Sequence, residues 1–280
     1  IHPMPDLKSL TIAISPCPND SYIFGAWVLG LTGDIEGYRS RFFWSDVEAL
    51  NEKAEHQEFD VVKVSAVQAL KLEESYHILK CGAAFGLEHG PKLVCLKEKT
   101  RGAPGRCLKG KFQRIGVPGL KTTAFWLLKA ALEYEFEPVP MLFDQIPLAV
   151  LKQKVDAGLV IHETALVYQQ YGLDLVLDLG KWWQARTGNL PLPLGLIIAR
   201  KTLASANQKL ILSVQEKIES SIRFARSRTQ SVWPFIKSLA QEMDDRVIEE
   251  HIDAYVNKYS LEMGEAGEQA LLHLRRLIEG

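Results

Sequence analysis

Short apolar runs alternate with longer amphipathic stretches along the first two thirds of the chain. Runs rich in Val, Ile and Leu predict strands, and stretches with apolar residues every three or four positions predict helices. The predicted strands are residues 9–15, 38–47, 59–65, 76–86, 91–99, 114–119, 138–144, 157–163, 173–178 and 196–201. The predicted helices between them are residues 21–30, 47–57, 66–70, 124–134 and 145–155, and an irregular aromatic stretch is expected at residues 179–188.

From Ala204 onward the spacing of apolar residues is helical throughout. Strands that alternate with helices indicate an α/β protein whose mixed sheets are mostly parallel. Residues 99–113 interrupt the pattern, since they are rich in Gly, Lys and Arg and have few large apolar side chains. We therefore expect two lobes with a central cleft, one formed by residues 1–105 and 199–280 and the other by residues 106–198.

The composition narrows the classes of function. The 280 residues carry 33 Lys and Arg against 34 Asp and Glu, without a polybasic block, so nucleic acid and membrane surfaces are poor partners. The four cysteines form no C-x-x-C pair, and no metal site is expected. No signal peptide is recognisable at the start of the sequence, so we expect a cytoplasmic protein, monomeric or homodimeric, that binds a small molecule.

Four predicted strand ends carry polar residues, and ligands of α/β proteins bind at such ends. Asn19 and Asp20 follow the first strand, as helix caps first and ligand contacts second, and Ser65 ends the third. Thr122 and Thr123 open a helix whose unpaired N–H groups suit a carboxylate, although the local sequence by itself favours ordinary helix capping by Thr. Cys17 is expected to be structural, because no base is identifiable near it in the sequence.

His162 follows the buried run "GLVI" and precedes Glu163. A neutral imidazole at a cleft is suited to act as a general base, and the alternative is a histidine that is hydrogen-bonded for structural reasons. Glu163 either orients His162 or starts a helix. The other histidines carry weaker signals, because they lie on predicted helices, beside charged residues or in a loop: His56, His77, His89, His251 and His273.

Seven fragments, in this order, resemble the 1,4-dihydroxy-6-naphthoate synthase family of the futalosine route to menaquinone. They are "SPCPNDSYIF", "DVVKVSA", "GVPGLKTTAFWLL", "AGLVIHET", "GKWWQARTG", "LPLPLG" and "YVNKYSLEMGEAGEQAL", and they extend over nearly the whole chain. The resemblance implies the fold of a type II periplasmic-binding protein. It also implies a carbon–carbon lyase that uses cyclic dehypoxanthine futalosine and needs no metal or organic cofactor.

The resemblance also implies roles for single residues. His162 corresponds to the family's base, Thr122 and Thr123 to the pair that holds the substrate carboxylate, and Ser65 to the serine after the third strand. Ile161, Asn19 and Asp20 are further expected substrate contacts.

The chain departs from the family pattern at several positions. Lys121 stands where many relatives have histidine and could strengthen anion binding, "GLEHGPKL" replaces a Gly-Cys-Gly-Pro type of loop, and Asn189 is an extra residue. The aromatic residue usual beside Ser65 is missing.

Two other functions remain open from the sequence. One is the related chorismate dehydratase, which lacks the histidine of "VIHET", and the other is a non-catalytic solute-binding protein of the same fold. An effector-binding domain of a transcription regulator is disfavoured, because no helix-turn-helix segment or basic face is present.

Overall fold

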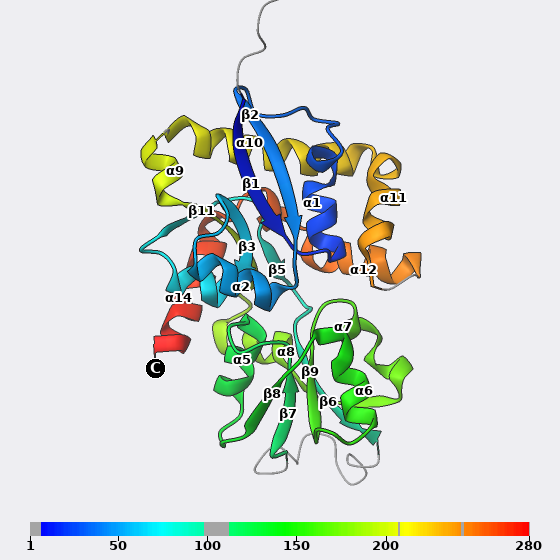
Figure 1. The fold of residues 1–280 in the computed structure, drawn as a ribbon. Coiled ribbons are helices and arrows are strands. Elements are labelled where there is room, and N and C mark those ends of the chain that lie inside the picture. Colours follow the sequence, from blue (N-terminus) through cyan, green and yellow to red (C-terminus); the bar gives the residue numbers. More distant parts are fainter. Residues whose placement is uncertain (1–6, 98–111, 207, 242–243, 280) are drawn as a thin grey trace, which may run out of the picture.

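The apolar runs form two separate sheets, one in each lobe (Figure 1). The computed structural model describes residues 7–97, 112–206, 208–241 and 244–279. The first sheet has the order β2 (Tyr38–Trp44), β1 (Lys8–Ile14), β3 (Val61–Ser65), β11 (Leu192–Arg200) and β4 (Tyr76–Ile78), and β5 (Ala84–Gly86) also pairs with β11. The second has the order β10 (Leu173–Asp178), β6 (Lys92–Leu96), β9 (Ala157–Val160), β7 (Arg114–Val117) and β8 (Glu137–Pro140).

Both sheets are mixed, and antiparallel pairing is more extensive than the sequence predicts. β1 pairs with β2 and β3 in parallel, and β7 with β8 and β9, but β11 and β6 are antiparallel to all their partners. These two strands follow the two chain crossings between the lobes. A chain that crosses enters the new lobe at the carboxyl ends of its parallel strands, so its first strand runs in the opposite direction.

The division into sheets differs from the predicted lobes at two places. β6 belongs to the second sheet, so the first crossing falls between Gly86 and Lys92 rather than near residue 105, which itself lies outside the described residues. β11 belongs entirely to the first sheet, so the second crossing precedes Leu192 rather than residue 199. Hydrophobic periodicity identifies a buried strand but does not say which sheet receives it.

The helices cover both faces of the sheets. They are α1 (Pro18–Val28), α2 (Val47–Glu55), α3 (Ala66–Lys71), α5 (Thr123–Ala131), α6 (Ile146–Leu151), α7 (Thr164–Val167), α8 (Leu179–Thr187), α9 (Lys201–Ala206), α10 (Gln208–Ser227), α11 (Thr229–Leu239), α12 (Asp245–Tyr255), α13 (Lys258–Leu261) and α14 (Gly264–Glu279). Short 3₁₀ turns, η1 (Phe143–Gln145) and η2 (Tyr168–Tyr171), precede α6 and follow α7. Among the described helices, none has the length and apolar character needed to cross a membrane.

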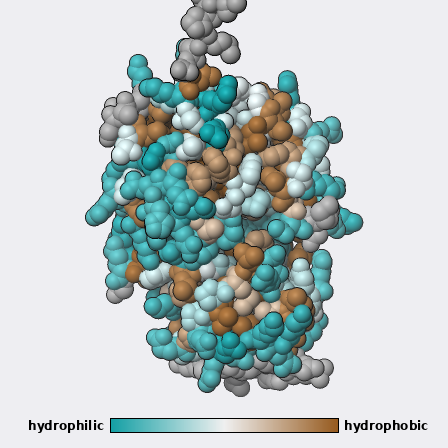
Figure 2. Space-filling model, viewed as in Figure 1, coloured by the Kyte–Doolittle hydropathy of each residue, from teal (hydrophilic) through white to brown (hydrophobic). Residues whose placement is uncertain are grey.

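β11 contributes side chains to two apolar cores, one on each face of the first sheet. Ile197 and Ala199 point to a cluster with α1, α10, α11 and α12, whereas Leu196 and Ile198 point to the opposite cluster with α2, α3 and α14. This alternation is the two-residue period of a strand that is buried on both faces. The second cluster continues into the other lobe, where it includes residues of β7, α5, β9 and α8. On the face shown in Figure 2, hydrophilic residues predominate over α2, and apolar residues are interspersed among them.

Three local expectations are corrected. The aromatic stretch after β10 is a regular helix, α8, because Asp178 accepts hydrogen bonds from the N–H groups of Gly180 and Lys181 and Gly188 ends the helix with φ +69°. The strand predicted at residues 76–86 is divided into β4 and β5. The N-cap of α1 is Cys17 rather than Asn19 or Asp20, and Pro18 occupies the first position of the helix.

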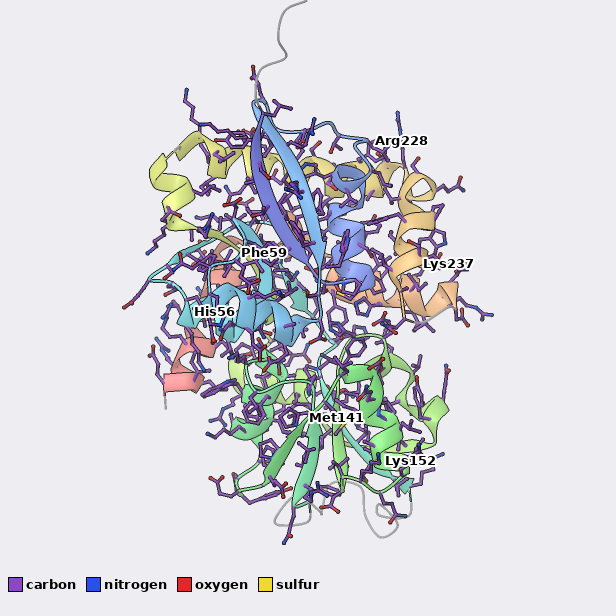
Figure 3. The ribbon with its side chains drawn as sticks, in the orientation of Figure 1. His56, Phe59, Met141, Lys152, Arg228 and Lys237 are labelled. Carbon is purple, nitrogen blue, oxygen red and sulfur yellow. The ribbon has the colours of Figure 1, made fainter. Side chains whose placement is uncertain are left out.

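Gly158 in β9 provides a test of the packing in the second lobe. A Cβ atom at Gly158 would lie 2.4 Å from Cγ2 of Ile146 and 2.8 Å from Cγ2 of Val150, both on α6. A Cβ atom at its register partner Gly116 would meet the flexible end of Met141, which is labelled in Figure 3, and Cγ2 of Val155, both at 3.4 Å, an ordinary contact distance. We expect Gly158→Ala to lower the free energy of unfolding by about 1–3 kcal/mol, the usual cost of overpacking, and Gly116→Ala to change it little. Urea unfolding of the two variants measures this, and equal losses would contradict it.

Candidate active site

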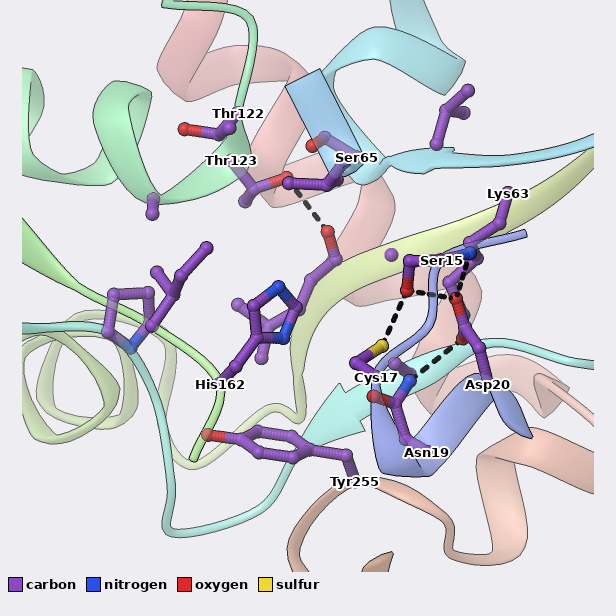
Figure 4. A pocket seen from close by; sticks show the side chains of 18 residues that line it. Ser15, Cys17, Asn19, Asp20, Lys63, Ser65, Thr122, Thr123, His162 and Tyr255 are labelled. Carbon is purple, nitrogen blue, oxygen red and sulfur yellow. Dashed lines mark hydrogen bonds and ion pairs between the residues drawn. The ribbon is translucent and has the colours of Figure 1, made fainter. Parts of the chain in front are cut away.

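One cavity lies where the carboxyl ends of β1, β3 and β9 meet the start of β11 (Figure 4). The space that these elements enclose, open solvent at the mouth included, is about 650 Å³. All seven residues singled out from the sequence line it: Asn19, Asp20, Ser65, Thr122, Thr123, Ile161 and His162. Lys63, Cys17 and Tyr255 line it as well, and neither Lys63 nor Tyr255 was predicted from the sequence to be a site residue.

Asp20 and Lys63 form a buried ion pair at one wall of the cavity. Asp20 Oδ1 lies 2.8 Å from Lys63 Nζ, and these side chains are only 1% and 6% exposed. Ser15 donates to Asp20 Oδ2 at 2.7 Å, and Asn19 Nδ2 donates to Oδ1 at 2.9 Å. The carboxylate is thus fully engaged, as a buried charge requires. Asp20 forms the wall of the site and has no oxygen to spare for a ligand.

Ser65 is placed at the end of β3 by Asn51 of α2. Asn51 Nδ2 donates to Ser65 Oγ at 3.0 Å, and Asn51 Oδ1 accepts the Ser65 N–H at 2.9 Å. The hydroxyl oxygen acts here only as an acceptor, so its hydrogen can be donated to a ligand in the cavity.

The two threonines hold the start of α5. Thr122 Oγ1 accepts the Phe125 N–H at 3.2 Å and donates to the Gly119 carbonyl at 2.9 Å. Thr123 Oγ1 donates to the Leu194 carbonyl at 3.1 Å and accepts the N–H of Val67. Both hydroxyl protons are used within the protein. The backbone N–H groups of the first turn, other than the Phe125 N–H that Thr122 accepts, have no intrahelical acceptors and can donate to a ligand.

Glu48 joins the two lobes beside this helix end. Its carboxylate accepts the N–H of Lys121 at 3.0 Å, and a Cβ atom at Gly119 would lie 2.3 Å from Glu48 Cδ, so only glycine fits there. The ammonium of Lys121 lies 3.2 Å from Glu55 and 3.9 Å from Glu52. Lys121 thus pairs with the opposite lobe and does not line the cavity, contrary to the expectation that it strengthens anion binding.

His162 is the second residue after β9. Its φ of +52° is a left-handed conformation that is unusual for a residue other than glycine and that occurs often at functional sites. The ring is half-buried and makes an edge contact with Phe143, at 4.8 Å between centroids. Burial lowers the pKa of His162 below its ordinary value, although Asp46 and Asp20 act in the opposite direction. The imidazole is therefore uncharged at neutral pH and can accept a proton.

His251 of α12 lies next to His162 and is fully buried. The ring centroids are 6.0 Å apart, and His251 Nε2 lies 2.9 Å from Asn19 Oδ1. Burial lowers the pKa of His251 well below its usual range, so it is neutral and forms no ion pair with Glu163, whose Oε2 lies 3.9 Å from Nδ1. Glu163 faces His251, and its side chain does not cap α7.

His251 was not predicted from the sequence to lie beside the site. It shares the buried face of α12 with Ile248, Ile252 and Tyr255, and this spacing of three and four residues was the available signal. Tyr255 contacts it edge-on at 4.9 Å, and burial raises the pKa of Tyr255, which stays a neutral phenol.

Cys17, His162 and His251 bring one potential metal-ligand atom each within 4.8 Å of one another, among the residues that the structure describes. Zinc requires a thiolate and free imidazole nitrogens at about 2.0–2.3 Å. Burial and then Asp20 raise the pKa of Cys17 well above its usual value, and Asn19 occupies one nitrogen of His251. The donor set therefore fits a group of neutral hydrogen-bonding side chains better than a metal centre.

The fold and the cleft define a periplasmic-binding-protein-like chain. The periplasmic aliphatic sulphonate binding protein SsuA of Escherichia coli superposes with a TM-score of 0.66 at 11% identity, over 98% of this chain and 88% of that one. This likeness concerns the fold alone. A protein of Archaeoglobus fulgidus is closer, with a TM-score of 0.88 and 35% identity over 97% of both chains.

Residues 10–279 match the family described as menaquinone biosynthesis, and the chain belongs to this family. The 1,4-dihydroxy-6-naphthoate synthase of Thermus thermophilus is 38% identical over 268 residues, which are 96% of this chain and 93% of the relative. The enzyme of the same name from Streptomyces coelicolor is 36% identical over 94% of this chain and 90% of its own. The resemblance read from the seven fragments is confirmed.

Substitution of Thr122 tests whether its hydroxyl stabilises the protein by capping the start of α5. Loss of a capping hydroxyl costs about 1 kcal/mol. We expect Thr122→Ala to lower the free energy of unfolding by about this amount, whereas Thr122→Ser retains both hydrogen bonds and the parent stability. Urea unfolding compares the pair, and an Ala variant as stable as the Ser variant would show that the cap contributes nothing.

Proposed function

We propose that this chain is a lyase that converts cyclic dehypoxanthine futalosine into 1,4-dihydroxy-6-naphthoate, with His162 as the general base. The observation that carries the proposal is an uncharged His162 lining the same cavity as Ser65 and the start of α5. The names of the two relatives support the product.

The substrate carboxylate would bind at the first turn of α5. The helix end supplies N–H groups and a positive dipole, and the Ser65 hydroxyl supplies a further donor. Apolar neighbours such as Val64, Ile161 and Leu194 would enclose the aromatic ring. Fixing one end of the substrate in this way can remove up to roughly 7–11 kcal/mol of the barrier through orientation.

Neutral His162 would then take a proton from the sugar-derived part of the substrate. The electron pair left behind opens the ring, the carbon–carbon bond breaks, and the naphthoate becomes aromatic. Asp46 and Asp20 favour the protonated form of His162, so they would stabilise the imidazolium that forms. General-base catalysis of this kind contributes about 10²–10⁴-fold.

Replacement of the imidazole tests the proposal. We expect His162→Gln to reduce kcat by at least about 10²-fold, because the base is lost, while the dissociation constant of 1,4-dihydroxy-6-naphthoate stays within a few-fold of the parent value. Mass spectrometry detects the product formed from the cyclic substrate. Near-parent turnover by the variant excludes His162 as the base, and a parent protein that binds the substrate without converting it is a binding protein.

The pH profile provides a second test. The groups around His162 are Asp46 and Asp20, which raise its pKa, Lys63, which lowers it, and neutral His251. Burial outweighs the carboxylates, so the folded pKa lies below the ordinary value of about 6.5. Since only neutral His162 is active, kcat/KM should be constant above pH 7 and fall on the acid side with a midpoint below 6.5. A midpoint above 7 would contradict this assignment.

A further inference from the structure

A second hollow adjoins the cavity on the outer side of His162. It is lined by Asp46 and Val47 of one lobe and by Leu142, Phe143 and Asp144 of the other, and its volume to the open mouth is about 670 Å³. Ser15, Cys17, Val47 and His162 line both spaces. We call the first space the inner compartment and the second the outer compartment. The imidazole thus stands at the boundary between them.

The two compartments differ in chemistry at the positions that a ligand can reach. In the inner compartment the buried carboxylate, Asp20, is paired with Lys63, and most of the remaining lining is apolar. In the outer compartment Asp46 uses Oδ1 to cap α2, through the Glu48 N–H at 2.9 Å, and Oδ2 has no partner among the described residues. Asp46 is half-buried beside the base, so this oxygen is a positioned acceptor.

Phe143 supplies an apolar surface in the same space. It is half-buried, is fixed by the edge contact with His162 at 4.8 Å, and lines the outer compartment but not the inner one. A flat apolar ring opposite a carboxylate oxygen matches a polyhydroxylated ring, whose C–H face is apolar and whose hydroxyls are donors.

We propose that the outer compartment binds the hydroxylated, sugar-derived part of the substrate, between the ring of Phe143 and the free oxygen of Asp46. This inference rests on the proposed function. With the aromatic acid in the inner compartment, the sugar-derived part extends past His162, which places the proton to be removed beside the base. After cleavage the small fragment can leave through the open mouth, while the aromatic product stays in the inner compartment.

The test compares substrate with product, because 1,4-dihydroxy-6-naphthoate lacks the sugar-derived part. Dissociation constants of both are measured by calorimetry at pH 8 in the His162→Gln protein, so that substrate is not consumed. Asp46→Ser is then introduced into the His162→Gln protein, since serine still caps a helix but does not provide the second oxygen. We expect substrate to bind about 10-fold more weakly or worse, as for a lost hydrogen bond to a charged group, and product to bind within twofold of the parent value.

Phe143→Leu keeps apolar volume against His162 and removes the flat ring, and it should show the same contrast. Asp244→Ser is the matched control, because Asp244 caps α12 by accepting the Arg246 N–H at 2.9 Å and lines neither compartment. The control should leave both constants unchanged.

The outcomes separate the two proposals. Suppose that the parent protein converts the cyclic substrate. If the dissociation constants of substrate and product in the Asp46 and Phe143 variants both equal the parent values, or both rise by the same factor, the outer compartment is not the sugar site. If the parent protein neither binds nor converts the cyclic compound, the proposed function and this inference both fail.

Discussion

The contact between the lobes is the constraint on which the site depends. A single apolar cluster extends from β3 and α3 of one lobe to α5 and β9 of the other, and the Glu48 carboxylate accepts the backbone N–H of Lys121 next to it. Because Gly119 has no side chain, the end of β7 can approach Glu48 of α2 closely, and the hydrogen bond from the Lys121 N–H to Glu48 holds it there. The positions of Ser65 and of the start of α5, which come from different lobes, are thereby fixed relative to each other.

The close approach of the two lobes also determines which side chains in the cleft are charged and which are neutral. Charges that are removed from water must be paired, and Asp20 and Lys63 satisfy each other with help from Ser15 and Asn19. A buried histidine without an ion-pair partner becomes neutral. Burial accordingly lowers the pKa of both His162 and His251. His162 is therefore neutral in the cleft, Asp20 is paired with Lys63 within the wall, and Asp46 is half-buried in the outer compartment.

The sequence predicted the parts of this structure that are set by local pattern. Polar residues at the ends of apolar runs, among them Ser65 and His162, meet in one cavity because the carboxyl ends of the parallel strands of the two sheets face the same cleft. The directions of β6 and β11 could not be read in this way, since they depend on where the chain crosses between lobes. Contacts between residues distant in the sequence could not be predicted either. Asn19 is hydrogen-bonded to His251, 232 positions away, and Asn51 of α2 orients Ser65 at the end of β3.

The same fold occurs in a periplasmic sulphonate binding protein, so the fold alone does not give chemistry. What the present chain adds is a proton acceptor at the point where the cleft changes from apolar to open. The left-handed backbone at His162 turns the chain away from the direction of β9, and the ring is held between Phe143 and His251. Under the proposed function, a base fixed at such a boundary would act on the junction between an enclosed aromatic group and its more polar substituent, where the bond to be broken lies.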